Sequence, residues 1–134
     1  MSPKNNEFVL DSYAILAFLQ KEPGYGRVEA LLKGAMTGDV RVHISAINLA
    51  EVHYHVLRRG RDASRILAAL EALPLKVASA DSYMQQAVEL RVKFGVPLGT
   101  CFAAALSQDL RKPLITGHRE FRKLGQTVNI EWLG

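Results

Sequence analysis

The chain has 134 residues, 49% hydrophobic and 22% charged, a composition that indicates a globular protein with a core and excludes disordered and fibrous classes. It contains 17 Lys and Arg against 13 Asp and Glu, an excess that by itself favours polyanionic partners only weakly. No apolar run approaches the roughly 18–20 residues of a membrane span. Residues 1–7 carry no apolar signal core, and the one cysteine, Cys101, fits a reducing compartment. We therefore expect a cytoplasmic protein that does not enter a membrane.

Hydrophobic patterns along the chain predict strands that alternate with helices. Strands are indicated by continuous apolar runs or by apolar–polar alternation, and helices by apolar residues three and four positions apart. In chain order the predicted elements are a strand at 8–10, helices at 12–20 and around 28–32, a strand at 40–44, helices at 46–59 and up to 73, a strand at 75–78, helices at 81–94 and 101–110, a strand at 113–116, a helical segment within 117–124 and a strand at 128–132. Glycines 34 and 38 are expected to end the second helix, and Thr100 to cap the helix at 101–110. This order predicts an α/β fold, one domain over residues 1–134, whose mostly parallel central sheet has helices on both faces.

Polar residues follow three of the predicted strands. Asp11 follows the first strand, Ser45 the second, and Thr116-Gly117-His118 ends the fourth. In open parallel sheets, ligands bind beyond the carboxyl ends of the strands, where the strand order reverses. We therefore expect the functional site at this edge of the sheet.

Asp11 and Glu51 are the candidate metal ligands. Asp11 alone fits a helix cap as well as it fits a ligand. Glu51 lies inside an otherwise apolar stretch, 47–56, near the start of a predicted helix, where a carboxylate also suits the helix dipole. It either faces solvent or converges with Asp11 as an oxygen ligand for Mg²⁺ or Mn²⁺.

Four segments of the chain fit one known pattern. They are FVLDSYAILAFL at 8–19, ISAINLAEV at 44–52, GVPLGTCFAAAL at 95–106 and PLITGHREF at 113–121. Together they resemble the PIN-domain nucleases, and within these the VapC-like toxins of toxin–antitoxin pairs. The resemblance implies a PIN-like fold and a metal-dependent endoribonuclease that cuts structured RNA such as transfer RNA. It also implies Mg²⁺ or Mn²⁺ as cofactor, a cognate antitoxin as partner, and a homodimer.

The resemblance further implies a cluster of three or four carboxylates, and this chain departs from it at two positions. Asp11 and Glu51 match, with the hydroxyl residues Ser45 and Thr116 expected nearby. Thr100 stands where the family usually has an aspartate before the Cys-Phe-Ala-Ala helix, and His118 where it usually has one after Thr-Gly. Losing two of four negative charges predicts weaker binding of a hard cation, and imidazole shifts the preference toward Mn²⁺, Zn²⁺ or another transition metal.

With two acids replaced, we expect the following roles for the residues of the site. Asp11 and Glu51 would hold the metal, and Thr100 would orient a water or a ligand. His118 would either ligate a softer metal or contact a phosphate of the RNA. All four are candidate catalytic residues, with Ser45, Thr116 and Glu120 in support.

Glu120 is a candidate substitute for a missing acid, and the cations around it are candidate RNA contacts. Glu120 can replace a missing acid, but a surface ion pair with Arg119, Arg122 or Lys123 is the favoured interpretation. The same three cations bracket His118 and are the candidate RNA contacts. Asp109, the other acid near the Thr100 helix, should face away from the site because its spacing places it on the opposite side of the helix.

Two further hypotheses compete with the nuclease. A PIN module that has lost half of its acids can keep the fold and bind antitoxin or RNA without cleaving it. A phosphoacceptor receiver-type domain shares the coarse α/β pattern, but it requires an acidic pair beside the first strand, where this chain has Asp11 alone.

Overall fold

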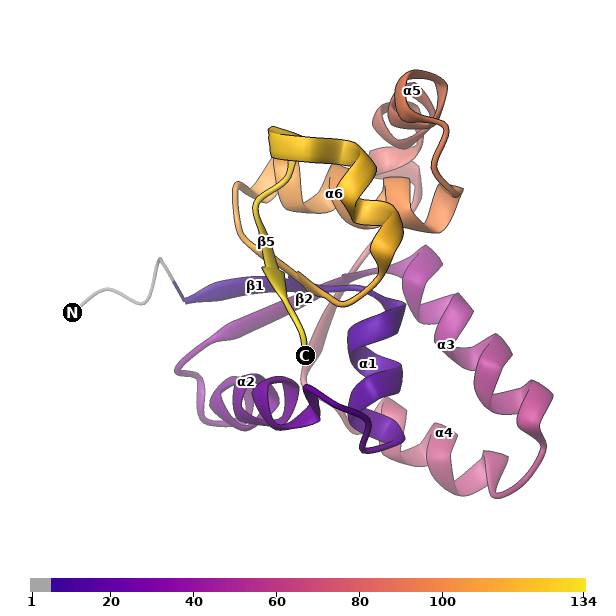
Figure 1. Cartoon of the computed structure of the whole chain (residues 1–134). Helices are drawn as coiled ribbons and strands as arrows, with labels where there is room; N and C mark the ends of the chain where they lie inside the picture. Colours follow the sequence, from indigo (N-terminus) through magenta and orange to yellow (C-terminus); the bar gives the residue numbers. More distant parts are fainter. Residues whose placement is uncertain (1–5) are drawn as a thin grey trace.

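The computed structural model describes residues 6–134, in which a five-stranded sheet lies between two layers of helices (Figure 1). The strands are β1 (Glu7–Leu10), β2 (Arg41–Ser45), β3 (Leu75–Ala78), β4 (Leu114–Thr116) and β5 (Ile130–Trp132). Their order is β3-β2-β1-β4-β5, and each neighbouring pair is parallel. The strand order therefore reverses between β1 and β4, whose carboxyl ends flank the place where ligands bind in such sheets.

One helical layer lies on each face of the sheet, as predicted (Figure 1). The first layer consists of α1 (Ser12–Leu19), α2 (Tyr25–Thr37), α3 (Ala46–Arg59) and α4 (Ala63–Glu71). The second consists of the short 3-10 turn η2 (Asp81–Tyr83), α5 (Met84–Phe94), α6 (Leu98–Leu110) and the 3-10 segment η3 (Arg119–Thr127). The predicted α/β class with helices on both faces is confirmed. Residues 1–5, part of the segment inspected for a signal core, lie outside the described residues.

Alternate residues of the central strands supply the two cores. Val9 and Leu114 pack with the α5–α6–η3 layer, whereas Leu10 and Ile115 pack with the α1–α4 layer. All four are fully buried. Because successive side chains of a strand point to opposite faces, a strand between two helical layers must be apolar at every position. This explains the continuous apolar runs in β1 and β4.

Two expected helix ends differ in the structure. α2 continues through Gly34 to Thr37, and Gly38, in the left-handed conformation, ends it. Gly34 instead allows close packing, because a Cβ at that position would lie 3.0 Å from Val40 Cγ2. The expected cap at Thr100 is also wrong: α6 begins at Leu98, directly after Pro97, whose fixed φ suits the start of a helix.

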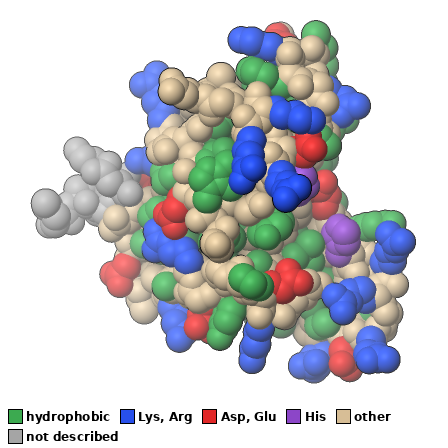
Figure 2. Space-filling model, viewed as in Figure 1, with side chains coloured by type: hydrophobic (Ala, Val, Ile, Leu, Met, Phe, Trp, Pro, Cys, Tyr) green, Lys and Arg blue, Asp and Glu red, His purple; other side chains and the backbone are tan. Residues whose placement is uncertain are grey.

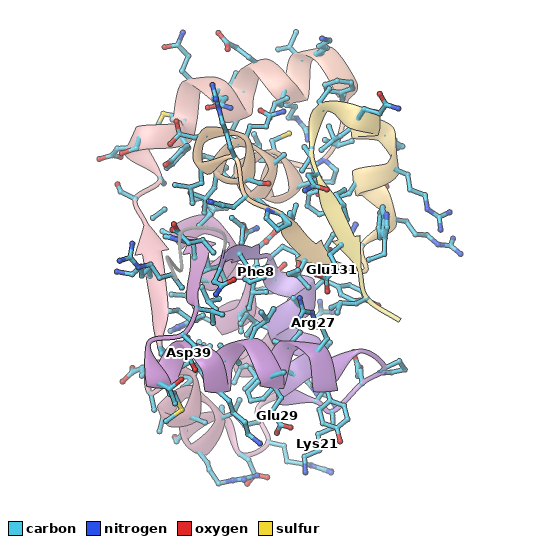
Figure 3. All side chains as sticks on the ribbon, turned by 90° about the vertical axis from the view of Figure 1, so that its left-hand side faces the viewer. Phe8, Lys21, Arg27, Glu29, Asp39 and Glu131 are labelled. Atoms are coloured by element: carbon cyan, nitrogen blue, oxygen red, sulfur yellow. The ribbon has the colours of Figure 1, made fainter. Side chains whose placement is uncertain are left out.

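The last strand, β5, contacts the helical layer formed by α1 to α4 through an ion pair. Arg27 of α2 donates from Nε to Glu131 Oε2 at 2.6 Å and from a terminal nitrogen to Oε1 at 3.0 Å, and its guanidinium lies 5.4 Å from the centre of the Phe8 ring. Figure 3 shows these three side chains together at the sheet edge. This bidentate ion pair joins β5 to α2. Within residues 6–134, every helix is too short or too polar to cross a membrane.

Candidate metal centre

A cavity of about 70 Å³ lies at the carboxyl ends of β1 and β4. Its walls come from the β1–α1 junction, α3, the start of α6 and the segment after β4. The lining residues are Asp11, Ser12, Asn48, Glu51, Pro97, Gly99, Thr100, His118 and Phe121. The structure therefore brings the four candidate catalytic residues to one small cavity, although up to 107 positions separate them in the sequence.

Asp11 caps α1 and also lines this cavity. Its Oδ1 accepts a hydrogen bond from the backbone N–H of Ala14 at 2.9 Å, and its Oδ2 accepts one from the Thr116 hydroxyl at 2.5 Å. The carboxyl group is buried, and loss of hydration raises its pKa to about 7 although both hydrogen bonds favour the charged form. The two interpretations of Asp11, cap and site residue, are thus compatible.

Glu51 reaches the cavity from α3, across from Asp11. Its Oε1 accepts a hydrogen bond from Asn48 Nδ2 at 3.0 Å. The carboxylate lies against Gly99 in the first turn of α6, since a Cβ on residue 99 would come within 2.8 Å of Glu51 Cδ. A negative charge at this end of α6 is favoured by the helix dipole.

Asn48 is a site residue that the sequence analysis missed. It is 1% exposed, and Nδ2 also donates to the carbonyl oxygen of Gly99 at 3.0 Å. Its Oδ1 has no hydrogen-bond partner within residues 6–134. A polar residue inside the apolar stretch 47–56, one turn before Glu51, is the signal that would have found it.

Thr100 and His118 stand at the cavity where the resemblance implies acids. Thr100 is buried in the first turn of α6. His118 is exposed, and its Nδ1 accepts the backbone N–H of Glu120 at 3.2 Å. When the ring is neutral, this hydrogen bond places the proton on Nε2. Nε2 is then a hydrogen-bond donor, which suits a phosphate oxygen better than it suits a metal ion.

Thr116 joins His118 to Asp11. Its Oγ1 accepts the backbone N–H of His118 at 3.0 Å and donates to Asp11 Oδ2. Thr116 is completely buried. It therefore holds the segment after β4 to the carboxyl end of β1, the two pieces of chain that form one side of the cavity.

Other candidates lie outside the cavity lining. Ser45 caps α3 by accepting the N–H of Ile47 at 3.2 Å, and Glu120 pairs with Lys123 at 3.1 Å, as the surface interpretation expects. Asp109 accepts the Tyr83 hydroxyl at 2.8 Å and is likewise absent from the lining. The pocket contains two carboxylates, and neither Ser45 nor Glu120 adds to it.

The oxygen atoms that line the cavity are of the type that binds a divalent ion, but they supply little negative charge. Two carboxylates and an unpaired amide oxygen are the hard ligands that Mg²⁺ and Mn²⁺ prefer. Within residues 6–134, however, no three His, Cys, Asp or Glu side chains form a group able to hold a metal. Because the Asp11 proton must also leave before the site carries two charges, we expect weak binding.

Cations lie on the segment that follows His118 and at the turn between α3 and α4. Figure 2 shows Lys and Arg side chains over the C-terminal helical segment and a second group over the ends of α3 and α4. The first group contains Arg119, Arg122 and Lys123, of which Arg122 lies 5.9 Å from the centre of the Trp132 ring. All three are exposed. A chain of phosphates entering the cavity would therefore meet positive charge beside His118.

Comparisons with known proteins show the family to which this fold belongs. The model of the PIN domain matches residues 8–126, so the chain belongs to the PIN domain family, whose members are in general divalent-metal-dependent nucleases. This membership confirms the family resemblance and displaces the receiver-type alternative. A search of curated proteins finds no match.

Several solved structures share the fold. A DNA-bound VapBC from Salmonella typhimurium is 22% identical with a TM-score of 0.71, over 94% of this chain and 97% of that one. VapBC2 from Rickettsia felis, bound to a promoter DNA fragment, is 19% identical with a TM-score of 0.69, over 96% and 99%. A toxin–antitoxin complex from Klebsiella pneumoniae is 20% identical with a TM-score of 0.64, over 92% and 94%.

Proposed function

We propose that this chain is the toxin of a toxin–antitoxin pair and cleaves RNA with Mg²⁺ or Mn²⁺. The observation that carries the proposal is the convergence of Asp11, Glu51, Thr100 and His118 on one cavity at the point where the strand order of a PIN fold reverses. An antitoxin partner is supported by structural neighbours that are VapBC and toxin–antitoxin complexes. The expected homodimer, which rests on the resemblance, and the cytoplasmic location, which rests on the hydropathy and cysteine content of the sequence, belong to the same proposal.

In this proposal each side chain of the site has a defined task. Asp11 and Glu51 hold the ion, which when bound activates water and neutralises charge on the phosphate. His118 donates from Nε2 to a phosphate oxygen, because Nδ1 is already engaged by Glu120. Thr100 orients a water or a ligand with its hydroxyl, and Arg119, Arg122 and Lys123 contact flanking phosphates.

One observation favours a second candidate, a PIN module that binds antitoxin or RNA without cleaving it. The cavity has two carboxylates, and one of them, Asp11, has its pKa raised to about 7 by burial. Magnesium affinity depends on carboxylate charge. A site with this little charge is compatible with a protein that kept its fold and lost its activity.

A cleavage assay separates the two candidates. The purified chain, free of antitoxin, is incubated with structured RNA and Mg²⁺ or Mn²⁺, beside Asp11→Asn and the double variant Thr100→Asp/His118→Asp. The nuclease proposal expects wild-type cleavage that chelation of the metal and Asp11→Asn both abolish, and faster cleavage by the double variant. Cleavage by the double variant alone would favour the binding module instead.

A further inference from the structure

We propose that Asn48 is the positioning residue of the metal site and acts by holding the Glu51 carboxylate in place. The inference rests on the proposed function, because it assigns a task toward the ion that Asp11 and Glu51 would bind. Asn48 lies on α3 one turn before Glu51 and lines the same cavity.

Asn48 joins two of the elements that form the cavity, α3 and α6. Its amide nitrogen donates one hydrogen bond to Glu51 Oε1 and one to the Gly99 carbonyl, each at 3.0 Å. The orientation of the amide follows from these partners, since a flipped amide would place its oxygen against two acceptors. The contact therefore couples the Glu51 carboxylate to the first turn of α6, which also carries Thr100.

Glu51 depends on this contact more than Asp11 depends on any single donor. Asp11 has a donor on each oxygen, whereas within residues 6–134 the Glu51 carboxylate accepts its hydrogen bond from Asn48. Gly99 supplies the opposite wall, because a side chain there would occupy the place of the carboxylate. The Glu51 carboxylate is therefore held between the Asn48 amide and the backbone of Gly99.

Within residues 6–134, burial of Asn48 leaves one polar atom of its side chain unpaired while the other makes two hydrogen bonds. The side chain is 1% exposed and its Oδ1 has no partner in the described part of the chain. A buried polar atom without a hydrogen bond destabilises the folded state. Leucine has a similar size but would leave Glu51 Oε1 and the Gly99 carbonyl without this donor, so we explain the asparagine by the two hydrogen bonds that it makes between α3 and α6.

The test compares metal affinity with stability in the full chain. Mn²⁺ is titrated into wild type, Asn48→Leu and Gly99→Ala, and free Mn²⁺ is followed by its electron paramagnetic resonance signal. We expect both variants to bind Mn²⁺ about tenfold more weakly, the effect typical of removing a group that orients a metal ligand. Asn48→Leu should also lower the thermal midpoint, because Glu51 Oε1 and the Gly99 carbonyl lose their donor, so a second variant must separate lost stability from lost metal affinity.

Ser107→Ala is the matched control for these two variants. Ser107→Ala removes another buried polar side chain, whose hydroxyl donates to the Lys112 carbonyl at 2.6 Å far along α6, and it should leave Mn²⁺ affinity unchanged. Equal affinities of wild type and Asn48→Leu would overturn the role of Asn48 and leave the proposed function standing. Failure of wild type itself to bind Mn²⁺ would overturn the metal site and this role together.

Discussion

At the scale of single residues, the site is a set of polar groups that the fold has taken out of water. Asp11 loses its hydration at the end of β1 and receives hydrogen bonds from Ala14 and Thr116 in exchange. The exchange is incomplete, because its pKa is still raised from 3.8 to about 7. The charged form of Asp11 is thus disfavoured in the metal-free protein, which has a measurable effect on stability.

Asp11 should make the metal-free protein less stable as the pH rises. Between about pH 4 and pH 7 the folded state holds a proton that the unfolded chain has released, so the free energy of unfolding falls with rising pH and levels off above 7. The shift corresponds to at most about 4 kcal/mol. Asp11→Asn should remove this slope and be more stable than wild type at pH 8, as measured by urea unfolding at a series of pH values.

Asp81→Asn is the matched control for this measurement. Asp81 is an exposed carboxylate at the start of η2, so its replacement should leave the slope as it is in wild type. If Asp11→Asn and wild type lost stability in parallel between pH 4 and 7, burial of the Asp11 charge would not be the cause.

At the scale of helices and strands, the residue that precedes a helix often accepts a hydrogen bond from a backbone N–H of the first helical turn. Ser45 accepts the N–H of Ile47 at the start of α3 and is absent from the cavity lining. Asp11 caps α1 in the same way, but it also lines the cavity. Position at a strand end therefore does not by itself separate a cap from a site residue.

Ser45→Ala should weaken folding without affecting the site. Loss of the cap hydrogen bond at the start of α3 is expected to lower the free energy of unfolding by about 1 kcal/mol. Mn²⁺ affinity should be unchanged, because Ser45 does not line the cavity. Urea unfolding and a Mn²⁺ titration of the same sample test both statements, and a clear fall in affinity would return Ser45 to the site.

At the scale of the whole molecule, two groups of exposed cations differ in their position relative to the cavity. Arg119, Arg122 and Lys123 lie on η3, directly after His118, while the other group of cations, Arg58, Arg59, Arg61 and Arg65, flanks the turn between α3 and α4. The first group follows the cavity residue His118 directly in the sequence, whereas the second lies at the other end of α3 from Asn48 and Glu51. A polyanion bound at the site should therefore depend on the first group.

RNA binding should become less sensitive to salt when these cations are removed. Each phosphate contact contributes roughly 0.7 to the slope of log affinity against log salt for a single strand. Replacing Arg119, Arg122 and Lys123 by glutamine should thus reduce the slope by about 2, measured by fluorescence anisotropy of a labelled RNA. Glutamine at Arg58, Arg61 and Arg65 should change it little, and a similar loss from both sets would argue against a defined RNA path.

The sequence by itself determined the order of elements, the fold class and the edge of the sheet at which four of the candidate residues meet. The apolar runs of β1 and β4 require burial on both faces, and residues that follow parallel strands must meet at one edge, so Asp11 and His118 were predictable as neighbours. Glu120, expected in support of the site but favoured as a surface ion pair, pairs with Lys123, because a carboxylate among three nearby cations has partners within its own turn.

Only the tertiary structure decided the details that depend on contacts between distant segments. Asn48 and Gly99 are 51 positions apart, and local patterns do not report that α6 starts at Leu98 or that its first turn lies against Glu51. The same holds for Gly34, which packs against Val40 instead of ending α2. Hydrophobic periodicity encodes which face of an element is buried, whereas packing between elements decides which polar atoms meet there.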